Sequence, residues 1–459
     1  MTQEEKYRQM TQPPVEGLIA KLAAPCIVSM LVSSFYNMAD TYFVGMLNDT
    51  AATGAVGVIF SMMAIIQAIG FFFGHGSGNY ISRCLGRRDV EEASTMASTG
   101  FFFAITAGVI LCIVGQIFLE PIAWGLGSTA TILPHSKAYL QVILLGAPWM
   151  IGSFVLNNQL RFQGSAAYAM IGITSGAVLN VALDPLLIFV FHMGVAGAGW
   201  ATIISQFVSF LILLAGSYRG SNIPIRFSNV RFRLWYLSNI IKGGLPSLAR
   251  QGLASVAGIA LNWTAGAYGG AAIAAMGVVQ RITNFGQSAM IGFGQGFQPF
   301  CGFNYGARKY ARVKKGFWFC VRVSFVFLVL VCIAGWIFAE PLVTCFRDDP
   351  DVISFGAMAL RLQCLTFWMQ SFVVMSNMMD QVMGKTVPAT FLAMARQGIF
   401  FIPAVLLLPV PLGALGVQLA QPVADALSLC SAIPIQKKVL ASLPDEDAPE
   451  ETEEVCASI

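Results

Sequence analysis

The sequence contains few charged residues. Asp, Glu, Lys and Arg make up 11% of its 459 residues, and apolar residues make up 56%. Soluble domains carry roughly 25% charged residues, and the mean hydropathy here is +0.70. This composition excludes an ordinary soluble protein and predicts a membrane protein, so the lipid bilayer is an expected partner and nucleic acid is not.

Histidine and paired cysteines are also scarce. The three histidines, His75, His135 and His192, lie far apart, and the ten cysteines include no CxxC pair. No metal spacing or disulfide framework is visible, so the cysteines are interpreted as small core residues. We expect no resident metal or cofactor. The short, basic loops offer no clustered acid and base groups, which argues against a membrane-embedded enzyme.

Two glycine-rich runs, GHGSG at 74–78 and GFGQGFQP at 292–299, lack the lysine of a phosphate-binding loop. We interpret them as places where helices approach closely. We also expect them to loosen the ends of the helices that contain them.

Long apolar runs recur along almost the whole chain. A helix needs about 20 residues to cross a hydrocarbon layer roughly 30 Å thick, and runs of that length without strict alternation indicate helices rather than a barrel. The expected spans are 18–44, 52–74, 94–116, 136–158, 165–191, 195–217, 238–264, 271–297, 316–338, 353–378, 387–410 and 413–435. The predicted fold class is therefore an all-α polytopic membrane protein with twelve transmembrane helices.

Lys and Arg gather in the loops on one side of this twelve-span arrangement, whereas the opposite loops hold Lys137 and Arg347. Positively charged loops stay in the cytoplasm, so both termini are expected there. The polar N-terminus shows no secretory signal.

The two halves of the chain repeat each other at an offset of about 220 residues. Pro25 corresponds to Pro246, and Glu120-Pro121 corresponds to Glu340-Pro341. Each repeat has an even number of spans, so the halves share one orientation and their two-fold axis runs along the membrane normal. The chain divides into a cytoplasmic N-terminal segment, an N-lobe, a cytoplasmic linker, a C-lobe and an acidic cytoplasmic tail: 1–17, 18–218, 219–237, 238–436 and 437–459.

Asp40 and Asp184 lie inside apolar spans of the first half and have no acidic counterpart in the second. An ionisable group at membrane depth costs roughly 2.5–3.5 kcal/mol on insertion scales. Such residues mark ion, proton or substrate pathways, so these acids are candidates for function rather than for folding.

Polar residues accompany both acids at helical spacing. Ser33, Tyr36 and Asn37 share a stripe with Asp40, and Pro25 removes a hydrogen bond from the same helix and permits a bend. In the second group Asn180 precedes Asp184 by one turn, and Thr202 precedes Gln206 by one turn. If these spans pack together, their oxygens suit Na⁺, and two neighbouring carboxyls equally suit a shared proton. The sequence leaves both open.

The motifs FYNMADTYFVG (35–45), NVALDPLLIF (180–189), GVAGAGWAT (194–202) and FNYGARK (303–309) resemble those of the multidrug and toxic compound extrusion (MATE) transporters, closest to the DinF-like prokaryotic branch. The resemblance implies two six-helix lobes facing a central cavity, alternating access and a prokaryotic inner membrane. It also implies an ion or proton network and a substrate cavity. The network would contain Asp40, Asn180, Asp184 and Thr202, and the cavity Pro25, Ser33, Tyr36, Asn37, Asn157 and Gln206.

The C-lobe departs from the pattern of some relatives. Its seventh span has no acid, and Asp380 is interpreted as a solvated helix terminus, so we do not expect a cation site there. Arg281 and Arg396 lie deep in their spans, and we expect no acid in their own half to neutralise them. They either bond helix-end carbonyls or form a lumenal network with Gln280 and Gln287.

The functional hypothesis is export of amphipathic, mostly cationic or zwitterionic small molecules, coupled to H⁺ or Na⁺, by a monomer. The alternative is a flippase for a lipid-linked precursor. A flippase should have a strongly cationic cavity and often extra spans, whereas the predicted N-lobe chamber is acidic and the spans number about twelve.

Overall fold

The computed structural model describes residues 2–46, 50–445 and 447. Within its helices, the side chains of 37, 38, 40, 41, 44, 45, 50–53 and 58 are outside the described part. The predicted roles of Asn37 and Asp40 therefore concern side chains that lie outside the described residues. The described residues contain helices and no strands.

Twelve membrane-spanning elements form two lobes of six. Those of the N-lobe are α2 (Val15–Gly45), α3 (Thr50–Gly86), α4 (Val90–Ile117), α6 (Leu133–Phe162), α7 (Ala166–Pro185) with the π-helical turn η1 (Leu186–Val190), and α8 (Gly194–Ser217). Those of the C-lobe are α9 (Leu234–Gly266), α10 (Gly270–Gly306), α11 (Tyr310–Ile337), α13 (Pro350–Cys364) with α14 (Gln370–Val382), α15 (Thr386–Met394) with η4 (Ala395–Ile399) and α16 (Phe401–Leu407), and α18 (Ala414–Ala441). Short elements complete the chain: α1 (Gln3–Thr11), α5 (Leu119–Gly125), η2 (Phe227–Asn229), α12 (Ala339–Phe346), η3 (Phe367–Met369) and α17 (Pro409–Leu412).

The predicted twelve-helix, two-lobe fold is confirmed. Among the described residues, eight helices are long and apolar enough to span a membrane, and the pair α13–α14, bent by 41°, brings the number to nine. The remaining three, α9, α10 and α18, have 33, 37 and 28 residues. They are long enough to span a membrane, but they are not apolar enough to be recognised as spans by length and composition alone. The polar spans are therefore concentrated in the C-lobe.

The internal repeat is visible in the backbone. Arg88 and Arg308 have φ values of 61° and 57°, and Gly164 and Gly384 have φ values of 80° and 78°. A non-glycine residue with positive φ is uncommon, so its recurrence at one offset supports a common ancestry of the lobes. The helix that follows Arg88 is α4, and the one that follows Arg308 is α11.

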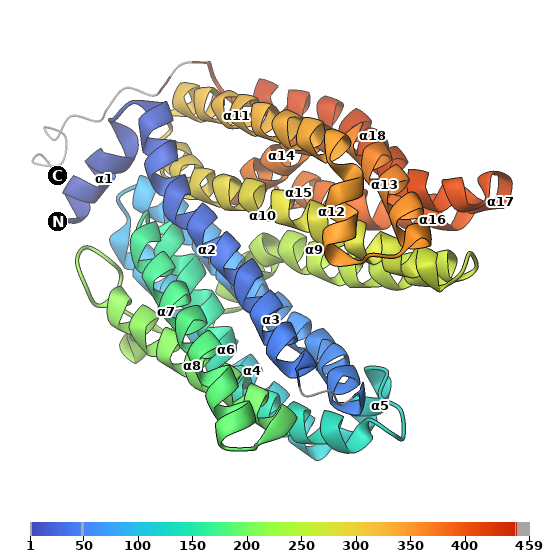
Figure 1. Ribbon diagram of the computed structural model, residues 1–459. Coiled ribbons are helices and arrows are strands. Elements are labelled where there is room, and N and C mark those ends of the chain that lie inside the picture. The colour runs from blue at the N-terminus through green and yellow to red at the C-terminus, as the bar shows by residue number, and fades with distance from the viewer. Residues whose placement is uncertain (1, 47–49, 446, 448–459) are drawn as a thin grey trace, which may run out of the picture.

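The lobes meet at the end of the molecule that holds α1 and spread apart toward the end that holds α5 and α17 (Figure 1). We call these the α1 end and the α5 end. At the α1 end the backbones touch. A Cβ at Gly86 would lie 2.2 Å from the carbonyl oxygen of Phe303, and a Cβ at Gly244 would lie 2.2 Å from that of Phe72. Small residues thus permit the close approach that the glycine-rich runs predicted.

The expected loosening of these helices was wrong. α3 continues as a helix through 74–78 to Gly86, and α10 continues through 292–299 to Gly306. Some of these glycines lie against the neighbouring lobe, where a larger side chain would clash; for example, a Cβ at Gly296 would lie 2.4 Å from the Cα of Ala23. Others lie against a helix of their own lobe, as Gly78 does against Phe162. Tight helix packing therefore surrounds these turns.

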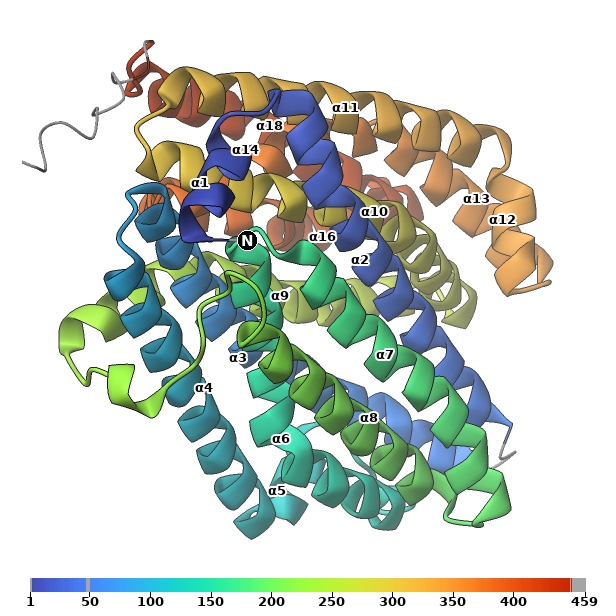
Figure 2. The ribbon, with the colours of Figure 1, turned by 90° about the vertical axis from the view of Figure 1, so that its left-hand side faces the viewer.

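The N-terminal segment is folded onto the α1 end, between the two lobes (Figure 2). The Lys6 ammonium group, 2% exposed, donates to Ser165 Oγ at 3.1 Å and to Asn222 Oδ1 at 2.9 Å. On the other side, Asn304 of α10 donates to the carbonyl of Met10 at 3.0 Å. α1 therefore contacts both lobes where they meet.

Candidate functional site

The buried acid of the N-lobe lies on a stripe of α7 that faces α8. Gly172, Gly176, Asn180 and Asp184 are spaced by four residues and are all buried. A Cβ at Gly176 would lie 2.9 Å from Cβ of Ser209. The two glycines therefore let the helices approach closely, and the next two turns of the same stripe carry the amide and the carboxyl.

Asp184, Asn180 and Thr202 form one cluster between α7 and α8. Asp184 and Thr202 are 0% exposed and Asn180 is 1% exposed. With its amide oriented so that both atoms are satisfied, Asn180 donates to Asp184 Oδ2 at 3.2 Å and accepts from the Thr202 backbone N–H at 3.2 Å. The structure thus brings together three of the four residues predicted for the ion or proton network.

The helix geometry changes directly after this cluster. α7 ends at Pro185 and continues as the π-helical turn η1, where Phe191 N–H donates to the Leu186 carbonyl at 3.0 Å. π-helical turns are rare and often occur at functional sites. A buried carboxyl beside an amide, a hydroxyl and an irregular turn can take up a proton or contribute oxygens to Na⁺. The described residues contain no group of three or more His, Cys, Asp and Glu that could hold a metal.

The residues predicted to line the cavity have several environments. Ser33 of α2 is half-buried and donates to the Ser29 carbonyl at 2.9 Å, and α2 passes through Pro25 as one helix. Tyr36 and Gln206 are partly exposed. Asn157, by contrast, is 8% exposed, and its amide donates to the Ala169 carbonyl of α7 at 3.1 Å. The structure therefore places Asn157 inside the N-lobe, where it joins α6 to α7.

The C-lobe contains a buried ion pair that the sequence analysis missed. Arg396 Nε lies 3.0 Å from Asp425 Oδ1, with side-chain exposures of 9% and 0%. The expectation that Arg396 has no acid in its own half was wrong. Asp425 lies on α18, inside the predicted span 413–435, and an acid in an apolar span was the signal that could have identified it.

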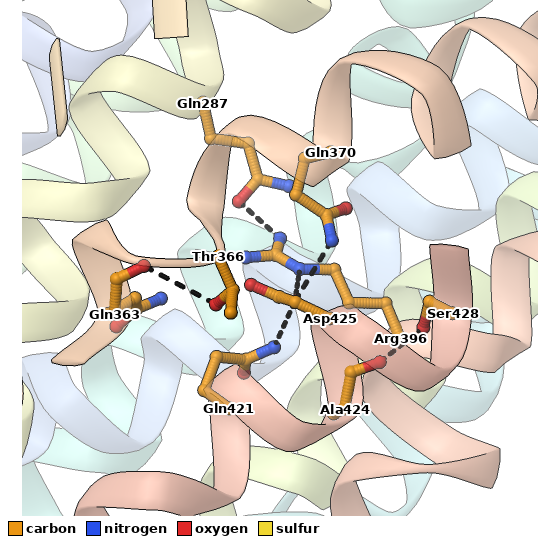
Figure 3. A network of polar contacts seen from close by, with 9 residues as sticks. All are labelled: Gln287, Gln363, Thr366, Gln370, Arg396, Gln421, Ala424, Asp425 and Ser428. Carbon is orange, nitrogen blue, oxygen red and sulfur yellow. Dashed lines mark hydrogen bonds and ion pairs between the residues drawn. The ribbon is translucent and has the colours of Figure 1, made fainter. Parts of the chain in front are cut away.

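Amide side chains hold this pair in place (Figure 3). Gln370 and Gln421 donate to Asp425 Oδ1 at 3.0 and 2.9 Å, and Arg396 donates to Gln287 Oε1 at 2.7 Å. The predicted association of Arg396 with Gln287 is therefore present. Buried charges need a counter-charge and hydrogen bonds. Neighbouring helices supply both at Asp425 Oδ1, whereas Oδ2 has no hydrogen-bond partner in the described part of the chain.

Two other members of the predicted C-lobe set lie elsewhere. Gln280 and Arg281 are exposed on α10, and no hydrogen bond in the described part of the chain joins them to Arg396. Six residues separate Arg281 from Gln287, which is roughly 9 Å along a helix. A shared lumenal network of all four residues is therefore not observed.

Asp380 is not a solvated helix terminus, contrary to the prediction. It is 0% exposed, and within the described part of the chain neither carboxyl oxygen has a hydrogen-bond partner. The residue belongs to the last turn of α14 at the α1 end, where α14 packs against α10. Helix ends at this end of the molecule are covered by the neighbouring helices, so sequence position alone misjudged the burial.

A two-lobed bundle of twelve spans, with charged groups buried inside both lobes, defines a polytopic membrane protein of the transporter class. The model of the MatE family matches residues 25–186 and again residues 246–406. Each match falls within one lobe, in agreement with the internal repeat. The chain therefore belongs to the MATE family.

The chain is similar to curated proteins named multidrug export protein MepA. It is 28% identical to that of Staphylococcus aureus over 431 residues, which cover 94% of this chain and 95% of the relative. It is 28% identical to that of Staphylococcus saprophyticus over 434 residues, covering 94% and 96%. The apolar spans and these relatives support a multi-pass bacterial membrane protein. Placement in the DinF-like branch stays a prediction.

Solved structures share the fold. An outward-facing multidrug resistance MATE family transporter of the MOP superfamily superposes with a TM-score of 0.89 at 24% identity, covering 95% of this chain and 98% of the other. A MOP superfamily transporter from Pyrococcus furiosus Vc1 has a TM-score of 0.88, with the same identity and coverage.

Proposed function

We propose that this chain is a cation-coupled antiporter, which exports amphipathic, mostly cationic small molecules by alternating access. The observation that carries the proposal is the Asp184 cluster, a carboxyl buried inside a membrane lobe beside Asn180 and Thr202. A carboxyl at that depth is expensive to keep. Its presence in a chain whose curated relatives are named multidrug export proteins fits a coupling role.

The proposed orientation follows from the positive-inside rule. Loops at the α1 end carry most of the Lys and Arg, so the α1 end faces the cytoplasm. The lobes are in contact at that end and spread apart at the other (Figure 1). The protein would then be closed to the cytoplasm and open outward, the state in which cargo leaves and the coupling ion enters. The chain would act as a monomer without a resident cofactor.

In the proposed cycle, H⁺ or Na⁺ arriving from outside neutralises the network of Asp40, Asn180, Asp184 and Thr202. Loss of negative charge weakens the hold on a cationic substrate, and movement of α2 about Pro25 releases it. The substrate would contact Ser33, Tyr36, Asn37, Asn157 and Gln206. Coupling requires that ion and substrate each prefer a different state of the carrier, because a ligand with equal affinity for both states shifts nothing.

Transport into proteoliposomes tests this proposal. We expect substrate movement to follow either an imposed H⁺ gradient or an imposed Na⁺ gradient, and Asp184→Asn to remain folded but lose it. Asp351→Asn is the matched control, because Asp351 is an exposed acid in the first turn of α13. Undiminished gradient-driven transport by Asp184→Asn would refute the coupling role.

The alternative is a flippase for a lipid-linked precursor. One observation favours it: Arg250 and Arg396 line one cavity of the C-lobe, and guanidinium groups bind phosphate. The names of the relatives favour drug export instead. Disrupting the gene separates the two, because a flippase defect slows cell-wall growth, whereas loss of a drug exporter lowers only toxin tolerance.

A further inference from the structure

A small polar cavity lies inside the C-lobe, beside the Arg396–Asp425 pair. It measures about 50 Å³, enough for a few water-sized groups. Its walls come from α9, α10, α14, α15 and η4, and its polar lining consists of Arg250, Gln287, Gln370, Asn377, Arg396 and Gln397. Most of these side chains can donate hydrogen bonds, which suits an oxyanion.

The cavity carries more positive than negative charge. Arg396 is neutralised by Asp425 at 3.0 Å. Arg250, on α9, instead donates to Asn377 Oδ1, a neutral acceptor, at 3.4 Å. In the described part of the chain, no Asp or Glu forms an ion pair with Arg250. Two guanidinium groups therefore line the same small space, and Asp425, which neutralises one of them, lies behind Arg396 and is not part of the lining.

Another arginine, which is buried, lies across the lobe interface from the partly exposed Arg250. Arg161 of α6 is 2% exposed, and its guanidinium contacts His75 Nε2 at 3.2 Å, Asn158 Oδ1 at 2.7 Å and Gln298 Oε1 at 3.4 Å. All three partners are uncharged acceptors when His75 donates its Nδ1–H to the Phe71 carbonyl. Arg161 is also close enough to Arg250 for the two charges to repel. An anion at the cavity would relieve this repulsion.

We infer that this cavity binds the anionic oxygen group of an amphipathic substrate, specifically a carboxylate, with Arg250 as the residue that holds it. An unneutralised guanidinium inside a membrane lobe is costly, and its fork of N–H donors matches a carboxylate in two-point contact. Arg396 would act as a positioning residue, since its Nε already donates to Asp425 and its Nη1 to Gln287. This inference rests on the proposed transport function and adds to it a preference for zwitterionic substrates, with the cationic part directed to the acidic N-lobe.

Binding of rhodamine B and its ethyl ester tests the inference, because the two share one cationic ring system and only the first carries a carboxylate. The readout is the ratio of the ester Kd to the rhodamine B Kd, measured by fluorescence anisotropy on purified protein. Arg250→Gln should lower this ratio roughly tenfold or more, because a charge-assisted bond to the carboxylate is lost. Arg250→Lys, which keeps the charge but not the fork, should lower it less. Arg281→Gln, on an exposed arginine of α10, should leave it unchanged.

An unchanged ratio in Arg250→Gln would overturn the inference, and so would an equal loss of affinity for both dyes, which indicates a merely structural role. If Arg250→Gln does not fold, the ratio in Arg250→Lys decides the question by the same criterion. A third arm uses dodecyl phosphate, and dependence on Arg250 for this compound alone would overturn the carboxylate assignment in favour of a lipid phosphate. Efflux of the ester by wild-type proteoliposomes is measured in parallel. Its failure would count against the transport function itself, whereas an unchanged ratio with intact efflux counts only against the Arg250 subsite.

Discussion

Arg396 and Asp425 form an ion pair inside the C-lobe, with Nε 3.0 Å from Oδ1. In the internal repeat, where Gly413 corresponds to Gly194, Asp425 occupies the position of Gln206. Asp184 lies on α7 and Asp425 on α18, so these two buried acids occupy different positions in the repeat. Arg396 neutralises Asp425, whereas the described groups beside Asp184 include the uncharged side chains of Asn180 and Thr202. We therefore expect Asp184, rather than Asp425, to bind a mobile cation.

Removing one partner of the C-lobe pair should destabilise the protein strongly. Asp425→Ala leaves Arg396 buried without a counter-charge, and breaking a buried pair in this way costs about 3–5 kcal/mol. The double substitution Arg396→Met with Asp425→Leu removes both charges and should recover much of the loss. The measurement is thermal unfolding in detergent of the wild type, the single variants and the double variant. Additive losses in the double variant would show that the two residues do not interact.

At the α1 end the backbones of the two lobes are in contact, so replacing an interface glycine by alanine should push the lobes apart. In Gly244→Ala the new Cβ would lie 2.2 Å from the Phe72 carbonyl oxygen, so α9 and α3 must separate. Gly252→Ala, on the same helix, meets no atom within 4 Å and is the matched control. Spin labels at Glu91 and Lys437, in a background without reactive cysteines, report the lobe distance at this end. We expect a longer distance in Gly244→Ala alone, and equal distances in the two variants would contradict the packing argument.

Docking of α1 should depend on pH through Lys6. Burial lowers the pKa of Lys6 to about 7, whereas a lysine in water has a pKa of about 10.4. Between these values the undocked segment binds a proton that the docked segment does not, so docking becomes more favourable as pH rises from about 7 to about 10. Hydrogen exchange of the α1 amides, corrected for intrinsic rates, measures this trend. Lys6→Met should abolish it, and the same trend in that variant would assign it to another group.

Much of the fold could be predicted from the sequence, because membrane thickness fixes the length of each span and the repeat fixes the symmetry. The N-lobe cluster was also predictable, since Asn180 and Asp184 lie one turn apart on the same helix and Thr202 lies on the next one. When residues lie on one helix or on two consecutive helices, their spacing in the sequence indicates where they lie relative to one another. This is why three members of the predicted network are found together.

The C-lobe was harder to predict, because several contacts of its ion pair join helices distant in the sequence. Arg396 and Asp425 lie on consecutive spans, but Gln287 is 109 residues from Arg396 and Gln370 is 55 residues from Asp425. Arg281 lies at a similar depth in its span, yet it is exposed, because the packing of α10 decides which face turns outward. Asp380 and Lys6 are buried by helices that cover the α1 end, a feature absent from any local pattern.

The central claim is that the coupling ion and the cationic substrate compete for the negative charge of Asp184. Measuring the ions released when substrate binds tests this claim most directly. Calorimetry of rhodamine 6G binding in buffers of different ionisation enthalpy counts protons released, and repeating the titration across Na⁺ concentrations counts Na⁺ displaced. The account predicts that the wild type releases one of these ions when the cationic dye binds, and that Asp184→Asn binds the dye without release. Binding by the wild type with neither ion released, or equal release by Asp184→Asn, would contradict it.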